Sequence, residues 1–376
     1  MVQRFTVARK IDDDGKQNLS RRFDMSRESH ADVGVVKRKE KAIVRILFMG
    51  RKNVATEVLD WLSRIPDVEV AGVLTDGHLK GSSTHSLAQR LGYVCYTFEE
   101  ALDQLRNGEL VYDLGVSILY WRKLTAEFLA APKMGSINFH PAPLPDYKGT
   151  GGYNFAILDK CASWGVSAHY MTEGIDDGPI IEVSRFAIDS EVETCVSLEK
   201  KSKLKLKDLI TRVITKIVID GEELSRLPNV GGRYITRREM EATKKIQPGD
   251  DIERKIRAFW FPPYDGAYIE IGRRRFTLVS KAILSCLPRN RKTGAPDQVV
   301  TDGVLVEIEG EKRVKSADDV DKKIRTFWCP PHDGAYVEMN GERFTLVNND
   351  ILSSLAPEGT TSLFTTHFAS FDDATD

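Results

Sequence analysis

The sequence predicts an α/β protein, with a doubly wound sheet followed by smaller α+β modules in a tandem repeat. Between residues 43 and 119, short apolar runs alternate with segments of helical periodicity, as in sheets covered by helices on both faces. Beyond residue 249, one stretch of sequence occurs twice, and each copy combines a helical pattern with a hairpin pattern. The 376 residues have room for two or three domains.

Strands and helices can be placed in order along the first half of the chain. The expected elements are the strand 43–49, a helix capped by Asn53, the strand 68–74, the helix 82–91, the strand 114–119 and a long helix over 194–219. Ligands of such sheets bind beyond the carboxyl ends of the strands. The turn at 50–52 lacks the GxGxxG pattern, so we interpret it as an ordinary connection and not as an anion site.

The stretch 134–178 carries two polar signatures around which the rest of the chain is organised. Asn138-Phe139-His140 follows an apolar run, and Gly174-Ile175-Asp176-Asp177-Gly178 comes later. Residues two apart on a strand point the same way, which brings Asn138 and His140 together. An amide can donate to an oxyanion, an imidazole can take a proton, and a carboxylate can orient the imidazole. The combination can therefore transfer an acyl group to an amine.

The same stretch resembles the formyltransferases that use 10-formyltetrahydrofolate. Their shared pattern appears here as Asn138-Phe139-His140, Leu144-Pro145, a turn at Gly149, Gly165-Val166 and Asp176. The likeness extends over residues 43–220. It implies a Rossmann-like catalytic domain, 10-formyltetrahydrofolate as the formyl donor, and Asn138, His140 and Asp176 as catalytic residues. Asp177 is expected to face solvent or the turn.

The resemblance also implies where the two substrates bind. Two loops are expected to wall the pterin of the folate, partly through backbone groups, with cofactor-binding residues Arg122, Lys123, Leu124, Glu173, Gly174 and Ile175. The loop after Pro145 is similar to the acceptor side of amino-sugar formyltransferases, which gives the substrate-binding residues Lys148, Tyr153 and Asn154. No metal site is expected.

These roles define a mechanism. The amine attacks the formyl carbon, and Asn138 with a protonated His140 stabilises the oxyanion, each donor contributing roughly 3 kcal/mol. Asp176 is expected to orient His140 and to raise its pKa. Taken singly, each residue has a structural explanation: Asn138 as a turn cap, His140 as a core imidazole and Asp176 as a turn former.

The repeat begins with Asp250–Trp260, which recurs as Asp318–Trp328, and the match continues without a gap for about twenty residues. Each copy predicts a short helix, with Asp250 or Asp318 as its N-cap, a proline-stopped turn and a β-hairpin. The hairpin turns are expected at Gly272 and at Asn340-Gly341. A unit of this size should dock on the catalytic domain or pair with its copy.

The expected domain boundaries follow from these patterns. They are a disordered extension over 1–42, the catalytic domain over 43–221, the first module over 222–287, the second module over 288–355 and a disordered tail over 356–376, with a linker at 285–299. Aspartates 12–14 argue against an organelle transit peptide.

Composition is typical of an ordinary soluble globular protein, and we expect a cytoplasmic one. The formal charge is −1 and 41% of the residues are hydrophobic, without a strong basic footprint for nucleic acid. The five cysteines form no CxxC pair and indicate reduced thiols. No apolar run approaches the ~18 residues of a membrane helix. We expect a small-molecule substrate and no membrane partner, and a homodimer stays open.

The parts of the chain outside the catalytic stretch reduce the number of candidate formyl acceptors. The glycinamide ribonucleotide transformylase usually stops after its catalytic domain, so the C-terminal repeats count against it. The methionyl-tRNA enzyme has a long basic loop after its second strand, whereas residues 75–83 are few and weakly charged. Enzymes that formylate nucleotide-linked amino sugars have a compact loop and accessory modules. The amino sugar therefore comes first and methionyl-tRNA second, with nucleic acid as a partner only in the second case.

Two further alternatives differ in chemistry. A hydrolase that deformylates the folate uses a related site and admits water as the acceptor. A non-catalytic scaffold could present the Trp-Pro-Pro repeats on a decayed domain, although the intact Asn138, His140 and Asp176 oppose this.

Overall fold

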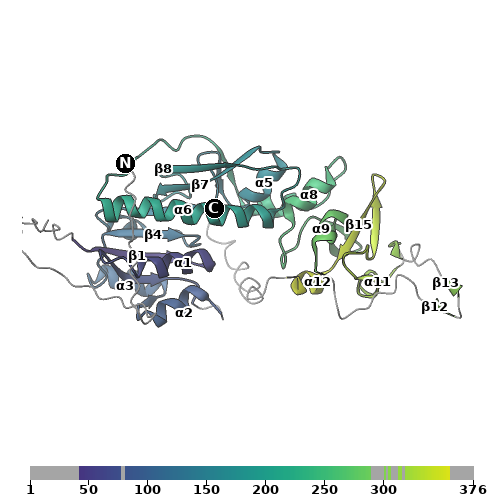
Figure 1. Ribbon diagram of the computed structural model, residues 1–376, viewed down its shortest axis with the longest axis horizontal. Helices are drawn as coiled ribbons and strands as arrows, with labels where there is room; N and C mark the ends of the chain where they lie inside the picture. Colours follow the sequence, from purple (N-terminus) through teal and green to yellow (C-terminus); the bar gives the residue numbers. More distant parts are fainter. Residues whose placement is uncertain are drawn as a thin grey trace, which may run out of the picture. The chain divides into compact units, whose positions relative to one another are not determined.

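The computed structural model describes residues 42–77, 81–288, 300–301, 304–305, 312–315 and 318–355 (Figure 1). Several segments named in the sequence analysis lie outside this part. They are residues 1–41 of the extension, residues 78–80 of the loop 75–83, residues 289–299 of the expected linker and the tail 356–376. Within the described part, no helix is both long and apolar enough to cross a membrane. Nor do three or more His, Cys, Asp or Glu side chains of this part gather in a way that could hold a metal ion.

The core is a seven-stranded sheet with strand order β3-β2-β1-β4-β5-β7-β8. Its strands are β1 Val44–Gly50, β2 Val68–Leu74, β3 Cys95–Tyr96, β4 Leu114–Ile118, β5 Ser136–His140, β7 Ser163–Tyr170 and β8 Ile180–Ala187. The first five in this order are parallel, and β7 and β8 add an antiparallel edge. The predicted α/β core is confirmed, and β5 ends at the sheet edge where the polar signatures lie.

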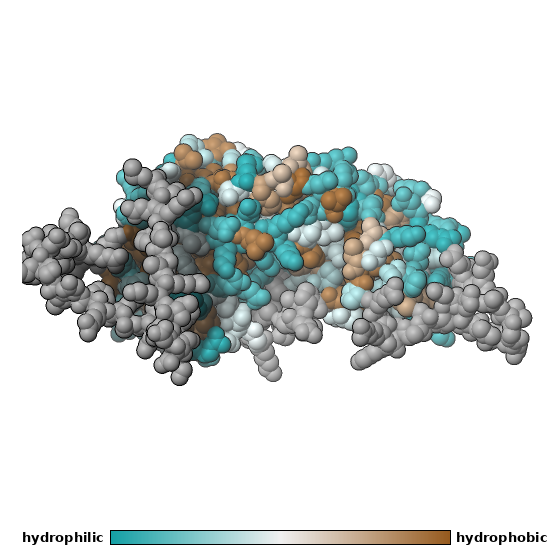
Figure 2. All heavy atoms as spheres, viewed as in Figure 1, coloured by the Kyte–Doolittle hydropathy of each residue, from teal (hydrophilic) through white to brown (hydrophobic). Residues whose placement is uncertain are grey.

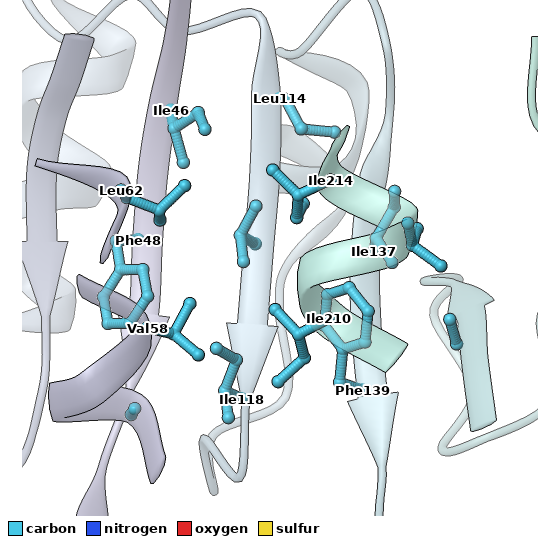
Figure 3. Packing of buried hydrophobic residues seen from close by; sticks show 14 of the residues in the cluster. Ile46, Phe48, Val58, Leu62, Leu114, Ile118, Ile137, Phe139, Ile210 and Ile214 are labelled. Atoms are coloured by element: carbon cyan, nitrogen blue, oxygen red, sulfur yellow. The ribbon is translucent and has the colours of Figure 1, made fainter. Parts of the chain in front are cut away.

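Helices cover both faces of this sheet. They are α1 Lys52–Leu62, α2 Ser83–Arg90, α3 Phe98–Arg106, α4 Ala126–Ala130, α5 Gly152–Leu158 and α6 Cys195–Ile214, which continues as the π-helix η1 Thr215–Asp220. Alternation along β1 shows the two layers: Ile46 and Phe48 pack under α1 and α6 (Figure 3), whereas Leu47 and Met49 pack under α3 and α4. Burying such a side chain contributes about 1.5–3 kcal/mol. On the face of the molecule in Figure 2, hydrophilic and hydrophobic residues are interspersed.

Several helices begin with the side-chain caps that the capping rules predict, whereas α1, α4 and α5 begin without one. Ser82 caps α2 by accepting from the amide of His85, and Thr194 caps α6 with a reciprocal capping box. The expected cap Asn53 is wrong, because α1 already begins at Lys52 after an extended Arg51. Asn53 therefore lies inside the first turn.

Two short strands join distant parts of the chain beside the core sheet. β6 Tyr147–Gly149 follows the proline loop, and it pairs in parallel with β9 Arg233–Ile235. The helix α7 Arg237–Thr243 follows β9. A further pair, β12 Val300–Thr301 and β13 Val304–Leu305, is antiparallel.

Both copies of the repeated sequence have the same order of elements. The first contains α8 Ile252–Phe259, β10 Tyr268–Ile271, β11 Arg274–Val279 and α9 Lys281–Cys286, and the second contains α11 Val320–Phe327, β14 Tyr336–Met339, β15 Glu342–Val347 and α12 Asn349–Ser354. They form one four-stranded sheet in the order β10-β11-β15-β14. Leu278 pairs with Leu346, its own counterpart, and the flanking pairs Thr277–Val347 and Val279–Thr345 are mirror equivalents. An approximate two-fold axis therefore relates the two copies and passes between Leu278 and Leu346.

The predicted N-caps of the repeat helices are shifted by one residue. Asp251 and Asp319 accept from the backbone amides of Arg254 and Lys322 and cap α8 and α11. Asp250 instead accepts from the amide of Gln247 at 2.6 Å and from Lys255 Nζ at 2.6 Å, and Asp318 makes the equivalent contacts. Both members of each Asp-Asp pair are thus used, but only the second one caps.

The first copy packs on the catalytic core through α8. Asn154 Nδ2 on α5 donates to the carbonyl of Ala258 at 2.7 Å. Arg254 Nη2 donates to both carboxylate oxygens of Glu191, at 2.8 and 2.9 Å, and Arg257 donates to the carbonyl of Glu193 at 3.1 Å. The counterparts of the two arginines in α11, which are Lys322 and Arg325, are exposed.

Candidate active site

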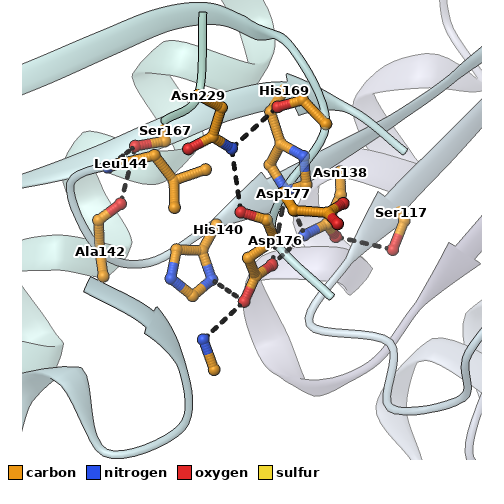
Figure 4. A network of polar contacts seen from close by, with 12 residues as sticks. Ser117, Asn138, His140, Ala142, Leu144, Ser167, His169, Asp176, Asp177 and Asn229 are labelled. Atoms are coloured by element: carbon orange, nitrogen blue, oxygen red, sulfur yellow. Dashed lines mark hydrogen bonds and ion pairs between the residues drawn. The ribbon is translucent and has the colours of Figure 1, made fainter. Parts of the chain in front are cut away.

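The structure brings the three expected catalytic side chains together at the end of β5 (Figure 4). Asn138 and His140 lie on this strand, and Asp176 reaches them from the loop between β7 and β8. His140 Nδ1 is 3.4 Å from Asp176 Oδ2, and Asn138 Nδ2 is 3.5 Å from Asp176 Oδ1. The carboxylate thus sits between an imidazole and an amide.

Asp176 is held ionised although it is only 9% exposed. Burial alone raises the pKa of a carboxyl, but nearby His140, His169 and the Gly149 amide, which donates to Asp176 Oδ2 at 2.9 Å, bring the pKa of Asp176 down to about 2. Asp176 also has a left-handed backbone with φ 54°. Aspartate tolerates this conformation better than most residues.

His169 belongs to the same cluster, and sequence reasoning missed it. It lies on β7 directly opposite Asn138, is 2% exposed, and places Nε2 at 3.1 Å from Asn138 Nδ2 and 3.5 Å from Asp176 Oδ1. Its Nδ1 is 2.8 Å from the carbonyl of Tyr170. Because a carbonyl only accepts, Nδ1 carries the hydrogen, and Nε2 of the neutral ring accepts from Asn138. A histidine within an otherwise apolar strand was the available signal.

Two partners on neighbouring strands fix the amide of Asn138. Its Nδ2 donates to His169, and its Oδ1 accepts from Ser117 Oγ on β4 at 2.8 Å. Ser117, Asn138 and His169 are cross-strand neighbours in register on β4, β5 and β7. The second N–H of Nδ2 is therefore left on the Asp176 side, where it can donate to an oxygen that gains negative charge.

His140 is 7% exposed and has both ring nitrogens in contact with the protein. Nε2 lies 3.0 Å from the carbonyl of Tyr147 and Nδ1 faces Asp176. Burial lowers the pKa of His140, because a desolvated imidazolium is destabilised, and the attraction of Asp176 offsets this only in part. Asp176 thus raises the pKa of His140 as expected, but burial outweighs it and the net shift is downward. The lowered pKa favours a neutral His140 over the expected protonated one, and a neutral imidazole suits the acceptance of a proton from an attacking amine.

The loop after His140 is locked by a serine of β7. Ser167 Oγ accepts from the amide of Leu144 at 2.8 Å and donates to the carbonyl of Ala142 at 2.7 Å. On the other side of the cluster, Asp177 is exposed and accepts from Thr172 Oγ1, so it faces the turn as expected. The contacts of Ser167 and of Asp177 thus fix the backbone of the two loops that adjoin the catalytic cluster.

Comparison with known proteins places this cluster in a family. Residues 95–214 match the family model described as formyl transferase. The chain is 27% identical to methionyl-tRNA formyltransferase of Listeria innocua serovar 6a, over 71% of this chain and 86% of that protein. It is 28% identical to the same enzyme of Phenylobacterium zucineum, over 70% and 88%. The family model and these relatives support a formyltransferase family for this chain. The chain is a formyl-transferring enzyme.

Solved formyltransferases share the fold. A 4-N formyltransferase from Francisella tularensis has a TM-score of 0.53 at 21% identity, covering 62% of this chain and 96% of that one. A sugar N-formyltransferase from Shewanella has a TM-score of 0.52 at 19% identity, covering 62% and 95%. At these identities the likeness establishes the Rossmann-like architecture of this formyltransferase.

The six residues expected at the pterin divide into two groups in this formyltransferase. Arg122 pairs with Glu99 at 2.8 Å and covers the ring of Phe98, Leu124 is buried in the core, and Lys123 is exposed. The side chains of Arg122 and Leu124 are thus used in packing, so only the backbone groups of these two residues are left to contact a pterin. Glu173, Gly174 and Ile175 form an exposed loop that leads directly into Asp176.

Two of the three residues expected at the acceptor are placed elsewhere. Asn154 is 8% exposed and its amide holds Ala258, while the Tyr153 ring packs 6.1 Å from that of Trp164. Both lie on α5: the Asn154 side chain stabilises the contact of α5 with α8, and the half-buried Tyr153 ring packs beside Trp164. Lys148 lies on β6 and donates to the carbonyl of Asn229 at 3.4 Å.

A tyrosine outside the expected set lies beside the catalytic cluster. Tyr234 on β9 is the register partner of Lys148, and it is 49% exposed. A Cβ placed on Gly149 would be 3.2 Å from the Tyr234 ring. Burial and the nearby Asp176 carboxylate raise the pKa of Tyr234. An aromatic face is therefore available next to the peptide that donates to Asp176.

Proposed function

We propose that this enzyme is an N-formyltransferase that moves a formyl group from 10-formyltetrahydrofolate to the primary amine of a nucleotide-linked amino sugar. The meeting of Asn138, His140 and Asp176 in one buried cluster carries the proposal. An amide donor, a neutral base and a fixed carboxylate are the groups that acyl transfer to nitrogen requires.

A reduced folate suits the surroundings of this cluster. The exposed peptides of residues 173–175 adjoin Asp176 and can meet the alternating donors and acceptors of a pterin. The structure of an N-formyltransferase from Helicobacter canadensis contains folinic acid and dTDP-3-aminofucose; its TM-score to this chain is 0.50 at 24% identity, covering 63% of this chain and 88% of that one. When bound, the folate supplies the formyl group.

The residues of the chain have separate tasks in this mechanism. Asn138 Nδ2 donates to the formyl oxygen, which gains charge as the acceptor nitrogen bonds to the formyl carbon. His140 accepts the proton that the amine loses, and it returns this proton to the leaving nitrogen. Asp176 stabilises the imidazolium while His140 holds the proton. His169 keeps the amide of Asn138 turned toward the reaction.

The half-exposed Tyr234 beside Lys148 supports a small acceptor. An aromatic face and an ammonium suit a planar base or sugar ring that carries phosphate. Transfer to methionyl-tRNA is the second candidate, because methionyl-tRNA formyltransferases match this chain over most of their own length. In that case nucleic acid becomes a partner.

A panel of acceptors tests the proposal. The full chain is supplied with 10-formyltetrahydrofolate and, separately, dTDP- and UDP-linked amino sugars, methionyl-tRNA, glycinamide ribonucleotide or no acceptor, and products are identified by mass. Formylation of an amino sugar supports the proposal, and transfer to tRNA alone replaces it with the second candidate. Formate release without any amine indicates a hydrolase, and failure to bind a folate analogue indicates a scaffold. His140→Ala is the catalytic control.

A further inference from the structure

Residues 227–235, called the strap here, cross the active-site loops after the polypeptide has left the core sheet. Leu227 exchanges two backbone hydrogen bonds with Ile180, at 2.8 and 2.9 Å. Farther on, the amide of Arg233 donates to the carbonyl of Asp146 at 2.9 Å. The strap lies beyond residues 95–214, which match the family, and beyond the expected catalytic domain 43–221.

The strap approaches the proline loop very closely. A Cβ placed on Gly232, whose φ is +78°, would lie 1.6 Å from the carbonyl oxygen of Pro145. Such a crossing is open only to glycine, since any side chain would collide with backbone. The path of the strap over the catalytic loop is therefore fixed on both sides of Asn229.

Asn229 on the strap holds the turn that carries Asp176 (Figure 4). Its Nδ2 donates to the carbonyl of Asp176 at 2.9 Å and to the carbonyl of Gly178 at 2.8 Å. Both partners can only accept, so the nitrogen and not the oxygen of the amide faces them. One side chain thus spans the turn in which Asp176 has its left-handed backbone.

A second connection runs from the same residue to the opposite side of the carboxylate. The carbonyl of Asn229 accepts from Lys148 Nζ at 3.4 Å, and Lys148 precedes Gly149, whose amide donates to Asp176 Oδ2. Asn229 therefore connects the strap both to the backbone of Asp176 and to the strand that orients its carboxylate.

We infer that Asn229 is a positioning residue that holds the Asp176 turn in its working geometry, so that the strap completes the active site. The inference rests on the proposed role of Asp176 in formyl transfer. Asn229 acts through Asp176 and does not itself contact the reacting atoms. A chain that ends at residue 221 should therefore lack an ordered catalytic carboxylate, even though it contains Asn138, His140 and Asp176.

Asn229→Asp is the sharpest test, because it keeps the shape of the side chain and replaces its donor with oxygens that face two carbonyls. We expect kcat to fall roughly ten- to hundredfold, as for a displaced catalytic group, while the KM of the acceptor and the Kd of a folate analogue stay within about twofold. Val230→Asp is the matched control, since it adds the same charge one residue away on a side chain that is 80% exposed. Asn229→Ala serves as a milder variant if Asn229→Asp does not fold.

A titration separates positioning from a merely structural role. If the Asp176 turn is released, His140 loses the attraction of the carboxylate, so its pKa should fall in Asn229→Asp and stay unchanged in Val230→Asp. NMR of the His140 ring in the full chain measures this without any acceptor, and so it stands even if the proposed acceptor is wrong. An unchanged His140 pKa, or an unchanged kcat in a folded Asn229→Asp protein, would overturn the inference.

Discussion

Asn138 on β5 and His169 on β7 are direct cross-strand neighbours, and the imidazole decides which way the amide faces. His169 Nδ1 is committed to the carbonyl of Tyr170, so only a lone pair is left for Asn138. The donor end of the amide is consequently turned toward Asp176. A residue that never meets the formyl group thus decides whether that group finds a hydrogen-bond donor.

Replacing His169 should therefore reduce the rate and leave acceptor binding unchanged. In His169→Phe, Asn138 Nδ2 loses its acceptor and the amide is free to turn over, so we expect kcat to be roughly ten- to hundredfold lower. His169→Gln is the matched control, because its side-chain oxygen can accept from Asn138 and should restore part of the rate. Steady-state kinetics measure both, and a wild-type kcat in His169→Phe contradicts this role.

The pH profile should show an acid limb below the ordinary histidine range. Burial lowers the pKa of His140, and the base must be neutral to accept the amine proton, so activity should be lost at a pH below 6.5, the usual pKa of a histidine. Because Asp176 is the strongest of the groups that favour the charged imidazole, Asp176→Asn should move this limb to still lower pH in the residual activity. Profiles of kcat/KM test the sign, and an upward shift in Asp176→Asn contradicts the assignment.

Asn154 should matter for stability and not for the acceptor. Asn154→Ala leaves the buried carbonyl of Ala258 without its donor, which should cost about 1–3 kcal/mol in the free energy of unfolding. The KM of the acceptor should stay unchanged. Urea unfolding and steady-state kinetics measure the two quantities, and the reverse pattern would restore Asn154 to the acceptor site.

Tyr234 should affect the acceptor and not the donor. Removing the half-exposed ring in Tyr234→Ala should raise the KM of the acceptor roughly two- to tenfold, in line with the energy of one aromatic contact. Tyr234→Phe keeps the ring and should stay close to wild type. Equal changes in the Kd of a folate analogue would place Tyr234 on the donor side instead.

The two leucines on either side of the approximate two-fold axis should be equivalent. Leu278 and Leu346 are both fully buried and face each other in the same environment, so Leu278→Ala and Leu346→Ala should each cost about 2–5 kcal/mol. The double variant should cost less than the sum, because both substitutions enlarge one cavity. Urea unfolding measures all three, and strongly unequal single costs contradict the symmetry.

What the sequence predicted well depends on short-range geometry. Asn138 and His140 are two residues apart on one strand, and Asp176 lies in a short loop between two glycines, so their meeting needed only a strand and a loop. His169 was missed because its partner is fixed by the pairing of β7 with β5, which a single strand pattern does not reveal. Asn229 and Tyr234 depend on contacts with residues more than fifty positions away.

The wrong expectations have equally physical causes. Asp250 and Asp251 are adjacent and chemically identical candidates for an N-cap, so the pattern could not choose the helix start. Asn154 lies in a polar loop sequence that suggests a substrate, yet α5 turns it toward Ala258, which is 104 residues further along the chain. Burial also outweighs the charge of Asp176 in setting the pKa of His140, and a sequence motif does not predict how deeply a side chain is buried.

The two copies of the repeat make unequal contacts with the core although they share one sheet. In the first copy, Arg254 and Arg257 bind acidic and carbonyl groups of the core. Substituting either arginine therefore removes a contact between the repeat and the catalytic half. Their counterparts Lys322 and Arg325 lie in the open, where the second copy is secured chiefly by its twin. One half of the pair thus serves as the anchor on the catalytic half, and the other extends from it through the shared sheet.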